Sequence, residues 1–347
     1  MPATTPHAPA RSASAFPTQP GHAPGGYRMK VVDLPDIRAA LDLDAAFEAV
    51  RQGFIAHFQG RVSLGAVSHL ALPAVSGDCH VKTASMHGQD CFVVKVATGF
   101  PHNAAQGRPT SNGMMVLLDA NTGVPRCLLR DAGWLTDMRT AMAGALAAEL
   151  LRPTEGDTLG IVGTGVQGAL QARLAAHRGG FSTLLIWGRR YPQAQQLAAE
   201  LCAEGIRARA LPSLDDLARA SDVLITTTPT STPLLQAGMF ERRVRIVAVG
   251  ADSPGKQELT TTLTAAMDIL IADSIDQCLD HGELASAFAL GHIKRSQVTA
   301  FGQYLAEATA IPNAQSVLVD LTGLGIQDLQ IALTIWNNLP GRDPGDA

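Results

Sequence analysis

The sequence is poor in cysteine and has no paired cysteines. Its five cysteines are scattered along 347 residues, and no two have the two-residue spacing of zinc and redox motifs. An odd, scattered set argues against a disulfide framework and against a zinc site, so we expect a reduced, cytoplasmic protein. The five are Cys79, Cys91, Cys127, Cys202 and Cys278.

Charge and long apolar runs are also scarce. Charged residues make up 17% of the chain, the formal net charge is -4, and there is no extended basic cluster. This composition argues against nucleic acid as a partner. No apolar run reaches the ~20 residues that span a bilayer, so we expect no membrane partner. The 46% of hydrophobic residues indicates a folded chain, and its length suits two domains.

The start of the chain lacks the apolar core of a secretory signal and is rich in proline, alanine, serine and histidine. We expect residues 1–27 to form a disordered tail. The alternatives are that Met29 is the true start, or that this stretch is a transit peptide.

Two patterns divide the rest of the chain. A strand is expected over 30–34 and a helix over 35–58, and short apolar runs between turn residues predict a sheet with hairpins over 62–129. An alanine-rich helix is predicted over 135–151, with Thr136 as its N-cap. Strand and helix then alternate, which predicts a parallel sheet with right-handed crossovers. These strands are 158–163, 183–187, 222–227, 245–250 and 269–272, and the helices are 166–177, 192–204 and, near the end, 327–336.

Three glycines follow the first of these strands: Gly163, Gly165 and Gly168. The first permits a tight turn, the second lets the backbone approach a pyrophosphate, and the third lets helix and strand pack closely. The N-terminus of the helix adds free N–H groups and a partial positive charge. Because the motif lies on a strand–turn–helix within a βαβ unit, it predicts a dinucleotide site. The alternative is a glycine-rich turn with no ligand.

The next strand lacks the acidic residue that usually binds the ribose 2′-hydroxyl of NAD. It ends at Trp187-Gly188-Arg189-Arg190, whose two guanidinium groups can pair with a 2′-phosphate. This ending favours NADP(H) over NAD(H); the alternative is that both arginines are solvated loop residues. Thr227 and Thr228, at the end of a later strand, are expected to line the same crevice.

Five stretches, taken in order, resemble the ornithine cyclodeaminase/mu-crystallin family. The similarity runs from about Lys30 to the C-terminus, and the glutamine after the second glycine, Gln167, is typical of this family. The stretches are Val94-Lys95-Val96 with Phe100-Pro101-His102-Asn103, Leu135-Thr136-Asp137-Met138-Arg139-Thr140-Ala141, Gly163-Thr164-Gly165-Val166-Gln167, Gly250-Ala251-Asp252-Ser253-Pro254-Gly255-Lys256-Gln257-Glu258-Leu259 and Gly323-Leu324-Gly325-Ile326-Gln327-Asp328.

The resemblance implies an α/β protein with a Rossmann-type doubly wound parallel sheet domain and a smaller α+β domain for substrate binding and dimerisation. We expect the substrate domain over 28–133, completed by 318–347, and the dinucleotide-binding domain over 134–317. The family includes cyclodeaminases, imino-acid reductases and an NADPH-binding crystallin. The resemblance therefore implies a homodimer that binds a small imino or amino acid together with NADP(H), which the arginines favour, or NAD(H).

The same resemblance assigns roles to three charged residues. Lys95 and Arg139 match the pair that binds the substrate carboxylate, and a guanidinium can donate two parallel hydrogen bonds to it. Lys95 could also donate a proton near the imine, and Asp252 matches the acid/base group. All three are predicted to be catalytic. The alternatives are a salt bridge of Arg139 with Asp137 or another acid, a solvated edge position for Lys95, and a turn-capping role for Asp252.

The early strand departs from the family pattern. Cyclodeaminases carry an arginine before the two-lysine segment, whereas residues 64–70 contain none. His69 and Lys82 are the nearby candidates for substrate binding, and Lys82 could bind a second anionic group, as on an imino dicarboxylate. The change argues against ornithine as the substrate. His281-Gly282-Glu283 does not have the spacing of a common metal site, so no metal is predicted.

Three functions follow as candidates. The first is an NAD(P)H-dependent reductase of a small imino acid, or amino-acid dehydrogenase, with hydride transfer at the carbon next to a carboxylate. The second is an ornithine cyclodeaminase-type lyase that uses tightly bound NAD+. The third is a non-catalytic, NADPH-binding protein like the crystallin. The predicted cofactor contacts are Thr140, Gly163, Gly165, Val166, Gln167, Arg189, Arg190, Thr227, Thr228, Val249 and Gly250.

Overall fold

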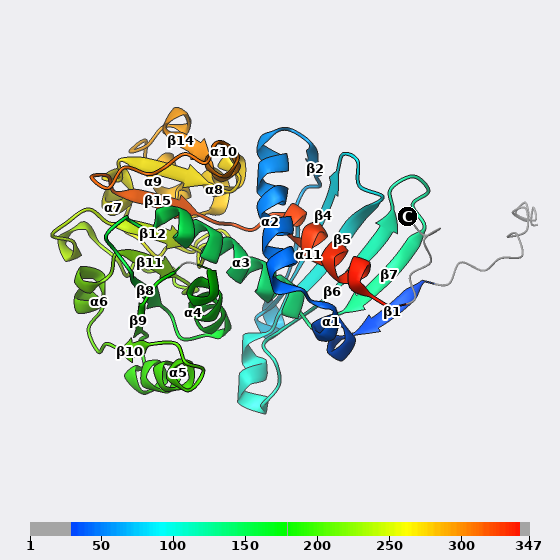
Figure 1. Cartoon of the computed structure of the whole chain (residues 1–347), viewed down its shortest axis with the longest axis horizontal. Coiled ribbons are helices and arrows are strands. Elements are labelled where there is room, and N and C mark those ends of the chain that lie inside the picture. Colours follow the sequence, from blue (N-terminus) through cyan, green and yellow to red (C-terminus); the bar gives the residue numbers. More distant parts are fainter. Residues whose placement is uncertain (1–28, 179, 341–347) are drawn as a thin grey trace, which may run out of the picture.

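The chain forms two β-sheets that lie side by side and are joined by the long helix α3, Trp134–Leu151 (Figure 1). The computed structural model describes residues 29–178 and 180–340, so the tail predicted over 1–27 lies outside the described residues. Seven strands form the first sheet and eight the second, which is entirely parallel. The predicted α/β architecture, a Rossmann-like sheet with a second domain on a mixed sheet, is confirmed.

The first sheet is mixed, because β1 pairs with β7 in parallel while the other pairs are antiparallel. Its order is β1-β7-β6-β5-β4-β2, and β3 pairs with β4. The elements are β1 Lys30–Asp33, β2 Val62–Leu64, β3 Ser68–Leu72, β4 Gly77–Met86, β5 Cys91–Gly99, β6 Ser111–Asp119 and β7 Pro125–Arg130, with α1 Leu34–Ala40, α2 Leu43–Phe58 and α11 Gly325–Asn338.

The two faces of this sheet differ in burial. Val93, Met115 and Leu129 are fully buried on the inner face, which α2 and α11 cover (Figure 1). Val94 and Val116 point to the outer face and are only partly buried. The alternation follows from the period of two along a strand.

The helix predicted over 35–58 is two helices. α1 ends at Ala40, and α2 begins after Asp42, whose side chain accepts a hydrogen bond from the Ala45 N–H at 3.0 Å. An aspartate in this position satisfies a free donor of the new helix. The single-helix prediction is wrong because the apolar spacing continues across the break.

The start of α3 also differs from the prediction. Gly133, with φ of +84°, precedes the helix, and the Leu135 N–H donates to Asp131 Oδ2 at 2.8 Å. Thr136 lies inside the first turn, so its prediction as the N-cap is wrong; Asp131 supplies the acceptor instead. Most of α3 is buried, since the helix passes between the two sheets.

The second sheet is doubly wound. Along β11, Val223 and Ile225 belong to one hydrophobic core and Leu224 to the other, so both faces of the sheet are covered. The order is β10-β9-β8-β11-β12-β15-β13-β14. The elements are β8 Thr158–Val162, α4 Val166–Arg178, β9 Thr183–Trp187, α5 Tyr191–Ala203, β10 Ala208–Ala210, α6 Leu214–Ala220, β11 Val223–Thr226, β12 Arg245–Ala248, α7 Thr261–Ala265, β13 Ile269–Ala272, α8 Ile275–His281, α9 Ala285–Ala289, β14 Val298–Ala300, α10 Phe301–Glu307 and β15 Val317–Asp320.

Strand β15 crosses the expected domain boundary. It pairs with β12 and β13 in the parallel sheet, so residues 318–320 lie there and not in the substrate domain. Only after Asp320 does the chain return to the first sheet as α11. The boundary was placed too early because β15 has only three apolar residues before Asp320, a run too short for its pattern to identify a strand. The strands β10 and β14 and the short helices α6 to α10 were likewise not predicted.

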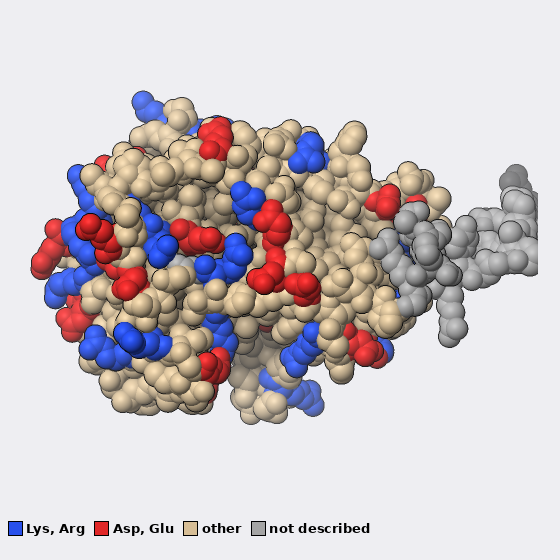
Figure 2. Space-filling model, in the orientation of Figure 1, with Lys and Arg blue, Asp and Glu red and all other residues tan. Residues whose placement is uncertain are grey.

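The surface carries charges of both signs. Figure 2 shows lysine, arginine, aspartate and glutamate side chains interspersed on the face in view, most densely over the part that holds the second sheet. Within the described ranges, no helix is both long and apolar enough to cross a membrane.

Candidate active site

A cavity of about 220 Å³ lies where the two sheets meet. Lys82 and Lys95 reach it from β4 and β5, Arg139 from α3, and Asp252 from the loop after β12. The fold thus brings together four charged residues from distant parts of the sequence. The lining residues are Val67, His80, Lys82, Lys95, Ala97, Thr136, Asp137, Arg139, Thr140, Gln167, Val249, Asp252, His281, Leu321, Thr322 and Gly323.

Asp328, on α11, holds Arg139 and Lys95 in place. Its carboxylate is fully buried; Oδ1 accepts a hydrogen bond from Arg139 Nε at 2.8 Å, and Oδ2 lies 3.9 Å from Lys95 Nζ. Arg139 Nη1 donates to Gln327 Oε1, also at 2.8 Å. Among the described residues Arg139 Nη2 has no hydrogen-bond acceptor, so this nitrogen remains available to a ligand.

The alternatives fare differently. Arg139 does form a salt bridge with an acid, but the acid is Asp328 and not Asp137 of its own helix. Lys95 is only 3% exposed, which excludes a solvated edge position. Burial lowers the pKa of Lys95 below the usual lysine value, although the charge of Asp328 opposes this. No role was predicted for Gln327 or Asp328. The signal that could have identified Asp328 is an acidic residue within a largely apolar helix.

Lys82 lies directly opposite Lys95 in the β4–β5 ladder. Its Nζ donates to Gly323 O at 2.6 Å and lies 3.4 Å from Thr322 O, on the loop before α11. Burial, together with the charges of Arg139 and Lys95, lowers the pKa of Lys82 to about 8. Because like charges that face each other across two strands repel, this part of the cavity favours an anionic ligand.

Asp252 enters from the other sheet and is paired with a lysine. Its Oδ1 accepts a hydrogen bond from Lys256 Nζ at 2.5 Å, and its side chain is 52% exposed. Burial acts to raise the pKa of Asp252, but the Lys256 ammonium outweighs it and holds that pKa below its usual value. At neutral pH the carboxylate is ionised, so it can accept a proton or a hydrogen bond.

Two histidines, His80 and His281, line the cavity without having been predicted as substrate contacts. His80 is two residues before Lys82 on β4 and shares its face. The predicted contact His69 is not among the lining residues. It lies opposite His80 in the β3–β4 ladder, and the two rings stack with centroids 4.4 Å apart. Because side chains alternate along a strand, His80 could have been predicted to share the face of Lys82. That His80 lies opposite His69 could not be predicted, because it depends on the register between β3 and β4.

The two stacked histidines form a cluster with Asp78, and atoms of the three that could bind a metal lie within 4.8 Å of one another. Imidazole and carboxylate groups are ligands that zinc accepts. However, Lys82 lies two residues after His80 on the same face of β4, and its positive charge repels a cation bound at this cluster.

A second cavity, of about 420 Å³, lies beside the glycine turn. A Cβ on Gly168 would lie 2.2 Å from the carbonyl oxygen of Gly163, and Gly163 itself has φ of +128°. These two positions need glycine for the turn and for the packing of α4. A Cβ on Gly165 would meet nothing within 4 Å, so the space in front of this residue is open. The turn therefore fits a dinucleotide whose pyrophosphate lies against the backbone at Gly165.

Arg189 and Arg190 line this second cavity from the end of β9, and both are exposed. No aspartate or glutamate is among the described residues that line it, so the acceptor typical of an NAD ribose site is not found there. Thr227 and Thr228 line it as well. The lining residues are Gly163, Thr164, Gly165, Trp187, Gly188, Arg189, Arg190, Gln193, Thr227, Thr228, Pro229, Thr230 and Leu234.

Three predicted cofactor contacts, Thr140, Gln167 and Val249, line the first cavity instead. Gln167 Nε2 donates to Asp137 O and Oδ1, both at 3.2 Å, and so ties the first turn of α4 to α3. This contact joins the dinucleotide turn to the charged cavity. Val166 is 57% exposed beside the turn.

Gly250 and Thr228 are tied together through the buried Glu258. The Glu258 carboxylate accepts hydrogen bonds from the Gly250 N–H at 2.8 Å and from the Thr228 N–H at 2.6 Å. These bonds hold together the loops that follow β11 and β12, from which Val249 and Asp252 reach the first cavity.

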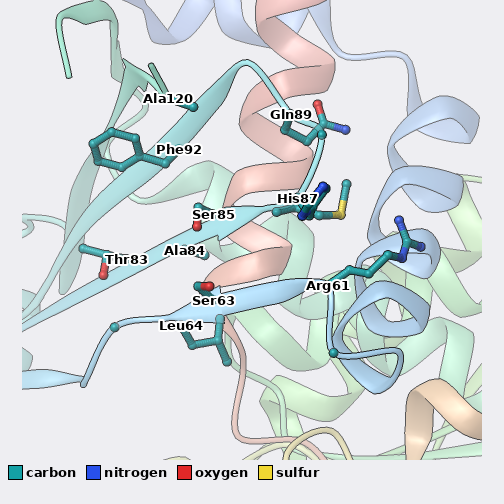
Figure 3. Close-up of a pocket in the computed structure, with 14 residues that line it drawn as sticks. Arg61, Ser63, Leu64, Thr83, Ala84, Ser85, His87, Gln89, Phe92 and Ala120 are labelled. Atoms are coloured by element: carbon teal, nitrogen blue, oxygen red, sulfur yellow. The ribbon is translucent and has the colours of Figure 1, made fainter. Parts of the chain in front are cut away.

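A larger hollow lies elsewhere on the molecule. It encloses about 810 Å³ between β2 and the β4–β5 turn, with Arg61, Ser63, Thr83 and Phe92 around it (Figure 3). None of the predicted site residues lines it, and Arg61 is the one lysine or arginine among its lining residues. The hollow therefore lacks the convergent charges that distinguish the cavity between the sheets.

The fold and the two cavities define a two-domain α/β protein with a Rossmann-like sheet and a charged cavity at the junction with a mixed sheet. The chain belongs to the ornithine cyclodeaminase/mu-crystallin family, whose model matches residues 29–343.

Individual relatives cover nearly the whole chain. An uncharacterized cyclodeaminase of Sinorhizobium fredii is 34% identical over 91% of this chain and 98% of the relative. The iminosuccinate reductase of Paracoccus denitrificans, solved in complex with NAD+, has 29% identity and a TM-score of 0.82, with 89% of this chain and 96% of that one covered. An archaeal alanine dehydrogenase dimer with bound NAD has 26% identity and a TM-score of 0.82, with 89% and 95% covered.

Proposed function

We propose that the protein is an NAD(P)H-dependent reductase of a small imino acid, which transfers hydride at the carbon next to a carboxylate. The observation that carries the proposal is that Lys95, Arg139 and Asp252 line one cavity, which Gln167 joins to the dinucleotide turn. The relatives named iminosuccinate reductase and alanine dehydrogenase support this class of reaction.

The reduction adds a hydride to the α-carbon and a proton to the nitrogen of the imine. When bound, the nicotinamide supplies the hydride. Arg139 and Lys95 bind the α-carboxylate, Arg139 through the nitrogen that Asp328 and Gln327 leave free. This binding fixes the α-carbon relative to the cofactor turn.

Asp252 acts on the imine nitrogen. Its ionised carboxylate stabilises the protonated imine, because opposite charges attract more strongly in a partly desolvated cavity. A protonated imine is the better hydride acceptor. Lys95, with its lowered pKa, can supply the proton.

The test is cofactor turnover. Purified protein mixed with NADPH or NADH, an α-keto acid and ammonia is expected to oxidise the cofactor, read as loss of absorbance of the reduced nicotinamide. Ammonia release from ornithine without net oxidation would instead support a cyclodeaminase, which the Sinorhizobium relative's name favours. Firm NADPH binding without turnover of any imino or amino acid would support the non-catalytic protein.

We propose NADP(H) as the preferred cofactor, because two arginines and, among the described residues, no carboxylate line the cavity at the end of β9. Replacing Arg189 with alanine is expected to raise KM for NADPH by about 10- to 100-fold and to leave KM for NADH nearly unchanged, since only the first carries a 2′-phosphate. Steady-state kinetics with both cofactors measures this. Equal changes for the two would contradict the NADP(H) preference.

We also propose a homodimer formed by the outer face of the first sheet. One row across this face consists of Thr83, Val94, Val116, Leu128 and Val31, as the strand registers show, and all but the threonine are apolar. Such a face is stabilised when a second copy covers it.

Replacing Val116 with glutamate is expected to convert the dimer to a monomer, because a carboxylate would be buried at the centre of the interface. Light scattering coupled to size exclusion measures the mass. Leu290, which is 63% exposed, offers a matched control, and its replacement with glutamate should leave the dimer intact. A wild-type monomer, or a V116E dimer as stable as wild type, would refute this interface.

A further inference from the structure

Lys82 carries a charge that no carboxylate of the described chain balances directly. Its hydrogen-bond acceptors are the carbonyl oxygens of Gly323, at 2.6 Å, and Thr322, at 3.4 Å. Among residues 29–178 and 180–340, no aspartate or glutamate oxygen lies within 4.0 Å of its Nζ. An ammonium has three N–H donors, so one remains for a ligand.

The acidic groups nearby have other partners. Asp137, which also lines the cavity, accepts a hydrogen bond from Gln167 Nε2 at 3.2 Å. Asp328 serves both Arg139, at 2.8 Å, and Lys95, at 3.9 Å. Asp252 is bonded to Lys256 at 2.5 Å. Asp273 lies behind the loop that holds Lys82 and accepts hydrogen bonds from the Thr322 hydroxyl and from the Gly323 N–H.

The three cations that line the cavity are not equally paired. Asp137 and Asp252 also line it, but Asp328 is the one carboxylate of the described residues that contacts Lys95 or Arg139, and none contacts Lys82. An imino acid whose single carboxylate binds at Arg139 and Lys95 leaves the charge of Lys82 without a direct partner. Leaving this charge desolvated and unpaired is costly. A second carboxylate on the ligand gives Lys82 a partner.

The position of Lys82 indicates where the second carboxylate binds. Arg139 and Lys95 are joined through Asp328 on the α11 side of the cavity, whereas Lys82 is tied to the loop at Gly323. His80, two residues before Lys82 on the same face of β4, also lines the cavity and offers a further hydrogen-bond donor. A short substrate can thus reach both groups of donors.

We propose that the substrate is a short imino dicarboxylate whose distal carboxylate binds Lys82; this inference rests on the proposed reductase function. The distal carboxylate takes no part in the bond changes. Hydride still adds to the α-carbon and a proton to the nitrogen, and Lys82 acts as a specificity-determining residue.

The experiment compares two substrates that differ in one carboxylate. Oxaloacetate with ammonia supplies a four-carbon imino dicarboxylate, and 2-oxobutyrate with ammonia supplies a monocarboxylate of the same chain length. Wild-type protein is expected to reduce the first with kcat/KM about 100-fold higher, which is the effect of one desolvated charge pair. Equal or reversed preference would overturn the inference.

Variants then locate the preference. Lys82→Met should lower kcat/KM for the dicarboxylate by about 100-fold and change it little for the monocarboxylate, which also shows that the variant is folded. Lys82→Arg should retain part of the preference. Lys294→Met, which removes an exposed lysine of the second sheet's domain, should change neither value. A K82M variant that keeps the full preference would overturn the role of Lys82.

Binding without chemistry separates this inference from the proposed function. With reduced cofactor present, which cannot oxidise an amino acid, calorimetry should show aspartate binding much more tightly than 2-aminobutyrate, and K82M should abolish the difference. If no substrate is reduced but this binding pattern is found, the reductase proposal fails and the dicarboxylate site stands. If substrates are reduced but both amino acids bind equally, the dicarboxylate site fails alone.

Discussion

Replacing Arg139 with lysine is expected to lower kcat/KM for the imino acid by about 100-fold or more. The guanidinium is shared between Asp328, which it contacts at 2.8 Å, and Gln327, also at 2.8 Å, and one nitrogen remains for the substrate. A lysine keeps the charge beside Asp328 but cannot direct donors to three partners in one plane. Steady-state kinetics at saturating cofactor measures the loss.

A surface pair provides the control for Arg139. Arg173 contacts the Glu204 carboxylate at 2.6 Å, and its side chain is far more exposed. Arg173→Lys should leave kcat/KM unchanged, because exposed pairs contribute little. If R139K retained wild-type kcat/KM, Arg139 would have only a structural role, and the proposed carboxylate site would have to be abandoned.

Replacing Asp328 with alanine is expected to lower the free energy of unfolding by about 3–5 kcal/mol, since it leaves buried cations without their partner. Asp328 is fully buried, and both Arg139 and Lys95 depend on it. Urea unfolding followed by circular dichroism measures the loss. The loss of unfolding free energy should exceed that caused by replacing a charged residue that is exposed to solvent.

Asp252→Asn is the matched comparison. Its carboxylate is half exposed and pairs with Lys256, so the expected loss of unfolding free energy is about 0–1 kcal/mol. The kcat of the Asp252→Asn variant should nevertheless fall, because an amide does not stabilise a protonated imine as a carboxylate does. An Asp252→Asn variant with full activity would remove Asp252 from the mechanism, and a stable Asp328→Ala variant would show that the buried charges find other partners.

Much of the candidate site could be predicted from local sequence. The glycine turn from Gly163 to Gly168 lies at the predicted place between a strand and a helix, because the spacing of these glycines serves a local geometry. Lys95 and Arg139 could be singled out by their motifs. Their buried partner Asp328 was part of a motif as well, but nothing local linked it to them.

Other features depended on register and topology. His69 was predicted to bind substrate, yet His80, opposite it in the ladder, lines the cavity. Val249 and Gln167 were expected at the cofactor and instead line the charged cavity. β15 was missed because a short apolar run has the same pattern in a loop, a helix or a central strand until its neighbours are known.

The sequence alone determined the elements whose signals are local: five strands of the second sheet (β8, β9, β11, β12 and β13), the helices α4 and α5, the alanine-rich α3 and the glycine turn. Hydrophobic period and backbone freedom act over a few residues, and so they can be read in order along the chain. Only the tertiary structure decided which charges meet. Lys82 and Lys95 are opposed by strand register, Asp328 reaches Arg139 from 189 residues away, and Asp252 comes from the other sheet. Electrostatic balance depends on distance in space and on exclusion of water, and neither is written in the order of residues.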